Sequence, residues 1–236
     1  GDAYGPPSTN TGQTISITWP TTDAPANSTI DLNLGSAGKS AATRPLVGKA
    51  NCAAWMDDLL DGLGIERAHL VGHSHSGWLA TNYALRAPQR IRHLVLLAPA
   101  GTLRPLVSAF WIRGLPILLS PQRERIVGFM DWMTVEGFFP DQRFVDQFVL
   151  GMQHVRSRIW AYPTAFSGRA LRRLVPRTLL FIGEQEVICD PHAAIDRARR
   201  LIPSLEAELV PRASHGLPIE RPALVNERVL SFLGRA

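Results

Sequence analysis

The sequence of 236 residues predicts an α/β fold, in which a mostly parallel β-sheet carries helices on both faces. The main observation is that short apolar segments typical of strands alternate with amphipathic segments typical of helices, from residue 29 to the end of the chain. The composition agrees, because 45% hydrophobic and 19% charged residues are ordinary for a globular domain with one core.

The first part of the chain is the least regular. Residues 1–28 form an atypical N-terminal segment rich in Gly, Pro, Ser, Thr and Asn, in which only residues 14–19 alternate like a strand. A short strand is expected at residues 29–34. A helix is then expected from Asn51, an N-cap residue type, to Gly64, which suits the position just past a helix end.

The later elements follow the same alternation. The expected strands span residues 67–72, 91–100, 177–183 and 207–210. The expected helices span residues 77–87, 191–202 and 222–233, the first of them stopped by Pro88. The strand at 67–72 contains almost only apolar residues between its ends, which predicts a buried strand.

One long segment interrupts this alternation. Residues 101–170 are mainly helical in pattern and rich in Phe and Trp, which predicts a helical cap inserted into the domain. The α/β core then consists of residues 29–100 and 171–236. Ligands of such sheets bind at the carboxyl ends of the strands, and we expect the cap to lie over that end.

The stretch "LVGHSHSGWLA", residues 70–80, contains the strongest functional signal. Ser74 follows a predicted strand and precedes a predicted helix, the context of a G-x-S-x-G nucleophile elbow. Gly72 occupies the first glycine position, whereas the second is Ser76, which is small but carries a Cβ. Ser76 itself is a poorer candidate nucleophile, because Trp78 would then fall on a position that needs a small residue.

A serine nucleophile requires a base and a carboxylate that orients it, and in this fold they follow in the order Ser, acid, His. His215 lies in a loop after the last expected strand and is the candidate base. The acid is expected after the strand at 177–183, where Glu186 is our first candidate. Asp190 is the reserve, because its place before Pro191 suits a helix cap.

Two other interpretations of the motif are considered. Ser74 could be a helix N-cap without chemistry, although Glu186 and His215 in the expected order argue against this. His73 and His75 could be metal ligands, but the nearby carboxylates and cysteines do not complete a ligand set, so no metal is expected. We instead expect His73 to pack beside the elbow and His75 to border the pocket.

With these pieces in order, the sequence resembles the α/β-hydrolase family, in its branch of capped serine esterases. The matching segments are "DLNLGSAGKS", "AHLVGHSHSGWLA", "IRHLVLLAPAG", "TLLFIGEQEVICDP" and "VPRASHGLPIERP". The resemblance implies hydrolysis of small carboxylic esters through an acyl-enzyme on Ser74, with His215 as base and Glu186 as its partner. It further implies the backbone N–H of His75 as one oxyanion donor, and no cofactor.

The sequence departs from the family pattern in two places. Glu186 stands where the family usually has Asp. The family also has a His-Gly motif after an early strand, which supplies the second oxyanion donor, and residues 1–28 contain no His. The alternative function is therefore a catalytically impaired or non-catalytic hydrolase-like protein with an atypical, shortened N-terminal part.

Charge and composition set the expected surroundings. The net charge is +5 and nearly all positive residues are arginines, yet no nucleic-acid-binding motif accompanies them, so no nucleic-acid partner is expected. No apolar run is long enough to span a membrane. Two cysteines make no disulfide framework, which suits a cytoplasmic location. The expected partner is a small-molecule ester, and the sequence carries no signal for an oligomeric state.

Overall fold

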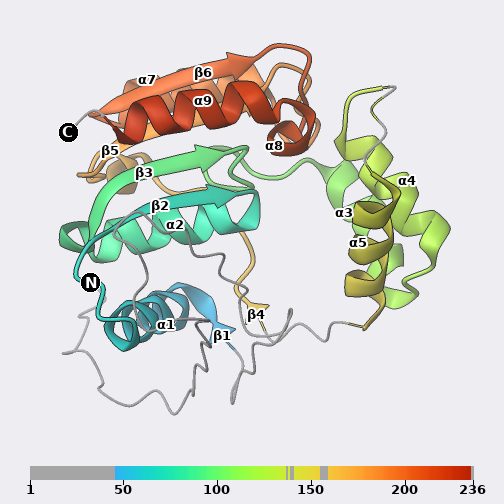
Figure 1. Ribbon diagram of the computed structural model, residues 1–236, viewed down its shortest axis with the longest axis horizontal. Helices are drawn as coiled ribbons and strands as arrows, with labels where there is room; N and C mark the ends of the chain where they lie inside the picture. Colours follow the sequence, from blue (N-terminus) through green and yellow to red (C-terminus); the bar gives the residue numbers. More distant parts are fainter. Residues whose placement is uncertain (1–45, 137, 139–140, 155–158, 235–236) are drawn as a thin grey trace. The chain divides into compact units, whose positions relative to one another are not determined.

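The structure, a computed structural model, describes residues 46–136, 138, 141–154 and 159–234 (Figure 1). The strands expected at residues 14–19 and 29–34, and the whole atypical segment 1–28, lie outside the described residues. The described chain divides into two compact units. The first contains β1 (Leu46–Val47) and β4 (Ile159–Trp160), which pair in parallel, and the helix α1 (Gly48–Gly62).

Helix α1 begins earlier than expected. Asn51 is not its N-cap but lies inside the helix, because Gly48 with a φ of +70° lets the chain turn from β1 directly into a helix. The other end agrees with the prediction. Gly64 has a φ of +66° and donates to Asp61 O, and Ile65 donates to Leu60 O, the hydrogen-bond pattern of a Schellman motif.

The second unit is built on a four-stranded parallel sheet in the order β2-β3-β5-β6, which confirms the predicted fold class. The strands are β2 (Ala68–His73), β3 (Ile91–Leu97), β5 (Arg177–Gly183) and β6 (Leu205–Val210). Each central register is continuous, for example Leu97 opposite Phe181 and Phe181 opposite Glu208. All four carboxyl ends therefore lie along the same edge of the sheet.

Two strand predictions need correction. The strand expected at 91–100 ends at Leu97, because Ala98 takes a φ of +43° and turns the chain away from the sheet. The expectation of a buried strand at 67–72 is wrong, since Val71 is 52% exposed. Among the described strands β2 lies at the sheet edge, and it pairs only with β3.

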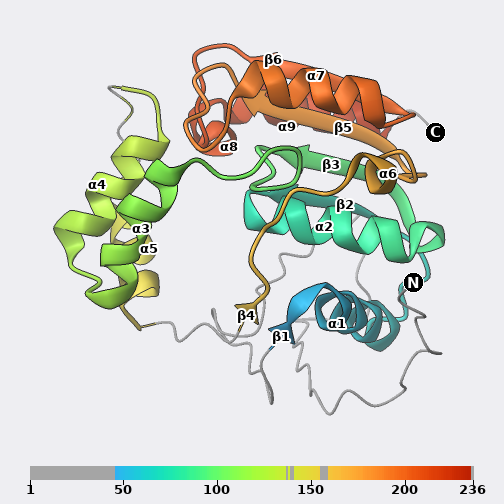
Figure 2. The same ribbon diagram turned by 180° about the vertical axis from the view of Figure 1, so that it is seen from behind.

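Helices cover both faces of this sheet (Figures 1 and 2). They include α2 (His75–Arg86), α7 (Pro191–Leu201) and α9 (Pro222–Leu233), with the short helices η1 (Pro88–Arg90), α6 (Gly168–Leu171) and α8 (Leu217–Glu220). The two views place α9 on one face and α2 and α7 on the other. Phe232 of α9 is fully buried against residues of one sheet face, among them Leu179 and Phe181.

The helices α3 (Ser108–Leu119), α4 (Arg123–Met133) and α5 (Gln142–His154) follow one another in the segment between β3 and β4. They have their own apolar cluster, centred on Ile117, Ile126, Met130 and Val149. Aromatic rings extend it, since Phe110 contacts Phe129 edge to face with 5.7 Å between ring centroids. Several aromatic residues of α3 and α4 thus pack against one another.

Two further observations concern the described part of the chain. None of its helices combines the length and the apolar character needed to cross a lipid bilayer. Cys52 and Cys189 are both free thiols, and burial raises the pKa of Cys52 to about 11 and that of Cys189 to about 12. Both therefore stay protonated at neutral pH.

Candidate active site

Ser74 occupies a sharp turn between β2 and α2. Its φ of 52° and ψ of −121° are unusual for a residue with a side chain, and such a conformation costs about 1–3 kcal/mol. The surrounding backbone holds it in place. Ser74 N–H donates to Leu97 O at 3.0 Å, and Ser74 O accepts from the N–H groups of Gly77 and Ala100, each at 3.0 Å.

Two glycines make this turn possible. A Cβ on Gly72 would lie 2.5 Å from Ser76 O, and a Cβ on Gly77 would lie 2.8 Å from Pro99 Cβ. The side chain of Ser76, by contrast, belongs to an exposed residue. Serine in place of glycine at position 76 therefore causes no crowding, because the close contacts of the turn are made at Gly72 and Gly77.

Three of the predicted residues come together at the carboxyl edge of the sheet. His215 Nε2 lies 2.8 Å from Ser74 Oγ, and His215 Nδ1 lies 3.0 Å from Glu186 Oε2. A carboxylate only accepts hydrogen bonds, so the Nδ1–H of His215 donates to Glu186. In the neutral imidazole this leaves Nε2 as the acceptor for the Ser74 hydroxyl proton.

Glu186 is buried, and both of its carboxylate oxygens have partners. While Oε2 faces His215, Oε1 accepts from the N–H groups of Val187 at 2.9 Å and Ile188 at 3.0 Å. Asp190 is placed differently. It is exposed, and its carboxylate caps α7 by accepting from Ala193 N–H at 2.9 Å. The structure therefore brings the first candidate, and not the reserve, to His215.

The loops that carry Glu186 and His215 are joined along their backbones. Gln185 N–H donates to Ala213 O at 2.9 Å, and the Ser214 hydroxyl donates to Gln185 O at 2.8 Å. The two loops can lie this close only because residue 183 is glycine, since a Cβ there would collide with Ala213 O. The distance between acid and histidine is thus set by the ends of β5 and β6.

The two histidines beside Ser74 have separate neighbours. His73 Nε2–H donates to His215 O at 2.8 Å, which confirms that His73 packs beside the elbow. Burial, helped by the adjacent His215, lowers the pKa of His73 to about 4. His75, the first residue of α2, stacks on Trp78 with 5.8 Å between ring centroids. Its position directly after Ser74 suits the predicted oxyanion role of its backbone.

Sequence reasoning missed Glu220, the last residue of α8. Glu220 is 9% exposed, and its carboxylate accepts two short hydrogen bonds, from Ser214 N–H and from Val135 N–H, each at 2.7 Å. The available signal was a single carboxylate five residues after His215, within the otherwise apolar run "LPIE". No helical or strand periodicity connects such a residue to Val135, which lies 85 positions earlier.

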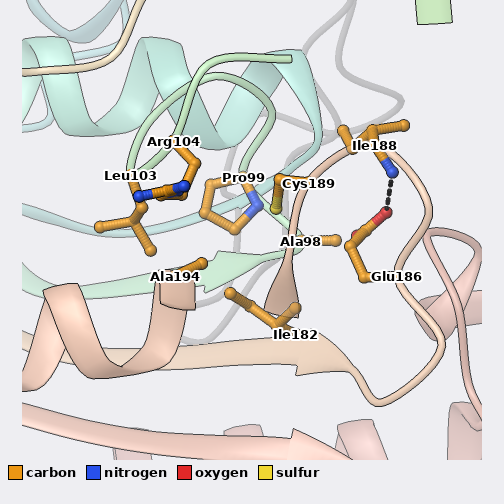
Figure 3. A pocket seen from close by; sticks show the side chains of 9 residues that line it. All are labelled: Ala98, Pro99, Leu103, Arg104, Ile182, Glu186, Ile188, Cys189 and Ala194. Atoms are coloured by element: carbon orange, nitrogen blue, oxygen red, sulfur yellow. Dashed lines mark hydrogen bonds between the residues drawn. The ribbon is translucent and has the colours of Figure 1, made fainter. Parts of the chain in front are cut away.

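A small cavity of about 10 Å³ is lined in part by Glu186 and Ile188, which lie in the loop after β5. Figure 3 shows the Glu186 carboxylate bonded to Ile188 N–H at its rim, with Pro99, Arg104 and Cys189 around it. A single water needs about 10–15 Å³, so this cavity is too small for an organic substrate. It is a packing feature beside the candidate site.

No three His, Cys, Asp or Glu side chains within residues 46–136, 138, 141–154 and 159–234 are grouped so that they could hold a metal ion. The arrangement that is present has a hydroxyl, an imidazole and a carboxylate connected in series. Such a series can remove a proton from the hydroxyl and store it on the imidazole.

A protein-family model and several known proteins are similar to this chain. The model of the "Alpha/beta hydrolase family" matches residues 11–228. An "uncharacterized carboxylesterase nap" of Bacillus subtilis (strain 168) is 35% identical over 190 residues, which cover 78% of this chain and 62% of that protein. The chain thus spans less than two thirds of this relative's length.

Solved structures of two Bacillus subtilis esterases are also similar. Carboxylesterase CesB superposes with a TM-score of 0.80 at 29% identity, covering 84% of this chain and 71% of that chain. Naproxen esterase superposes with a TM-score of 0.75 at 34% identity, covering 84% of this chain and 70% of that chain. Both likenesses extend well beyond the residues around Ser74.

Proposed function

Because the chain belongs to the α/β hydrolase family, we propose that it is a serine hydrolase that cleaves small carboxylic esters. The observation that carries this proposal is the series Ser74 Oγ, His215 Nε2, His215 Nδ1 and Glu186 Oε2, with separations of 2.8 and 3.0 Å. The carboxylesterase names of its relatives support the choice of an ester over other acyl compounds.

In the proposed reaction Ser74 Oγ attacks the ester carbonyl carbon while His215 Nε2 takes the hydroxyl proton. Glu186 keeps the imidazole oriented and stabilises its positive charge. The tetrahedral intermediate collapses, the C–O bond to the alcohol breaks, and His215 returns the proton to that alcohol. Water then attacks the acyl-enzyme by the same proton route and releases the carboxylic acid.

The oxyanion of the intermediate needs hydrogen-bond donors. We assign one to the backbone N–H of His75, which follows the nucleophile at the start of α2, where helix N–H groups point toward the preceding turn. One such donor is worth about 10²–10³ in rate. In the family, a His-Gly motif after an early strand supplies the second oxyanion donor. Residues 1–28, in which we looked for that motif, lie outside the described part of the chain.

We also infer that residues 101–170, with α3, α4 and α5, act as a cap that contributes to substrate selection. Support comes from a contact at the end of α4, where Met133 O accepts from the N–H of Gly216, the residue after His215, at 3.1 Å. Exposed apolar side chains on α3, among them Trp111, Leu115 and Leu119, favour a substrate with an apolar acyl or alcohol group.

The decisive experiment is labelling with a fluorophosphonate probe, with the adduct located by mass spectrometry. We expect one adduct on Ser74 and none in Ser74→Ala. Ser76→Ala is the matched control, because this exposed serine lies two residues further on and should not affect labelling. A series of p-nitrophenyl esters of increasing chain length then defines the acyl preference.

A different outcome would favour the alternative function. If the folded wild-type protein remains unlabelled and hydrolyses none of the esters, the chain is a non-catalytic hydrolase-like protein under these conditions. Labelling that survives Ser74→Ala would instead move the nucleophile to another residue.

A further inference from the structure

Glu220 joins two segments that are far apart in the sequence. One carboxylate oxygen accepts from Ser214 N–H, next to His215, and the other accepts from Val135 N–H, just after α4. Both distances are 2.7 Å, at the short end for hydrogen bonds and typical of a charged acceptor. A buried carboxylate held by two backbone donors is fixed in position, because any movement leaves one donor unpaired.

The backbone on the other side of His215 is connected to the same segment. Gly216 N–H donates to Met133 O at 3.1 Å. A Cβ on Gly216 would lie 2.8 Å from Thr134 Cγ2 and 3.3 Å from Glu220 Cδ, so these groups are closely packed. The residues before and after His215 are thus both connected to residues 133–135.

We propose that Glu220 is a positioning residue for His215: its carboxylate ties the His215 loop to the segment after α4 and so sets where the imidazole stands relative to Ser74. This inference rests on the proposed function in its catalytic part. It also means that the placement of α4 and the geometry of the reacting groups are coupled through this side chain, together with the backbone hydrogen bond from Gly216 to Met133.

The test compares Glu220→Ala with Glu220→Gln. Alanine removes both acceptors, whereas glutamine keeps one amide oxygen and turns a donor toward the other N–H. Since a misplacement of about 1 Å can cost about 10² in rate, we expect kcat of Glu220→Ala to fall about 10- to 100-fold, with KM changed less than about twofold. Glu220→Gln should fall between alanine and wild type.

Glu208→Gln is the matched control. Glu208 lies on β6 and accepts from Arg228 Nε of α9 at 2.6 Å, so its replacement affects stability through an ion pair between β6 and α9. We expect its kcat per labelled active site to stay within about twofold of wild type. A purely structural role of Glu220 would give this same result, with a lower melting temperature and unchanged kcat, and would overturn the proposal.

Hydrogen exchange measured by mass spectrometry separates this proposal from the proposed function. Glu220→Ala, or Glu220→Gln if the alanine variant does not fold, should exchange faster in the peptides around residues 133–136 and 212–217. Unchanged exchange in both peptides would overturn the proposal that Glu220 ties the His215 loop to the segment after α4. If wild type is neither labelled nor active, the proposed function and the catalytic part of this inference fail, and the exchange result alone decides the tether.

Discussion

At the scale of single residues, the position of Glu186 makes a sharp prediction. Glu186→Gln should lower kcat by about 10²–10⁴, because an amide can donate to His215 Nδ1 and favour the tautomer that cannot accept the Ser74 proton. Steady-state kinetics with the best p-nitrophenyl ester measure this loss. The protein should remain folded, since the glutamine oxygen can still accept from Val187 and Ile188.

Asp190→Ala is the companion variant, because Asp190 is the other carboxylate of the same loop. We expect it to lower the free energy of unfolding by about 1 kcal/mol through the lost cap of α7, with kcat nearly unchanged. A loss of kcat in Asp190→Ala larger than that in Glu186→Gln would reverse the assignment of the acid.

His73 predicts how stability depends on pH. Its pKa is about 4 in the folded protein, against about 6.5 for an unperturbed histidine, so below pH 6.5 the unfolded chain binds a proton that the folded protein does not. The contribution to stability is complete above pH 6.5 and is lost as the pH falls toward 4. At pH 5 the loss from this residue is about 2 kcal/mol.

His73→Gln is the variant that tests this, because glutamine retains an N–H donor for His215 O and cannot titrate. Urea unfolding at pH 8 and pH 5 should show a smaller difference between the two pH values in the variant than in wild type. Equal differences in both proteins would show that His73 is not protonated differently in the folded and unfolded states.

At the scale of elements, the turn between β2 and α2 depends on glycine. Gly72→Ala places a Cβ 2.5 Å from Ser76 O, and backbone atoms cannot move aside as a flexible side chain can. We expect a loss of about 1–3 kcal/mol in the free energy of unfolding together with a strong loss of fluorophosphonate labelling, because the turn that presents Ser74 shifts.

Gly128→Ala provides the contrast. Gly128 lies within α4 and a Cβ there would meet nothing within 4 Å. Alanine should therefore raise the free energy of unfolding by about 0.5–1 kcal/mol and leave labelling unchanged. A stabilised Gly72→Ala variant would show that the turn is less crowded than the structure indicates.

At the scale of the whole molecule, the parallel sheet separates stability from chemistry. The candidate site lies at the carboxyl ends of the strands, whereas Phe232 packs near their amino ends, where its ring contacts His93 at 5.2 Å and the Arg177 guanidinium at 5.1 Å between centres. Phe232→Ala should cost about 3–5 kcal/mol in the free energy of unfolding.

The same variant should leave kcat per folded molecule nearly unchanged, because the printed ring contacts of Phe232, with His93 and Arg177, lie near the amino ends of the strands, whereas Ser74 lies at their carboxyl ends. Chemical unfolding and active-site titration at a temperature well below the transition measure the two effects separately. A matched loss of kcat and stability would show that the two edges of the sheet are coupled.

The order of the described helices and strands could be predicted from the sequence, and so could the residues of the candidate site. Local patterns predicted the limits of β5 and α9, because a continuous apolar run marks the strand and Pro222 suits the first position of the helix. The elbow context pointed to Ser74, and chain order pointed to His215. Local patterns predicted the wrong helix start at Asn51. The helix α1 begins at Gly48 instead, directly after β1.

The contacts of Glu186 with His215, of Asp190 with the start of α7, and of Glu220 with Val135 could be seen only in the folded structure. The contacts of Glu186 and Glu220 depend on which loops meet at the sheet edge, and no residue spacing encodes a distance across 29 or 85 positions. The burial of β2 was wrongly predicted for the same reason, since an apolar run looks the same in an outer strand, as β2 is among the described strands, as in a central one. Contacts between distant segments are a property of the folded chain, and they determine which of several suitable side chains lies beside His215.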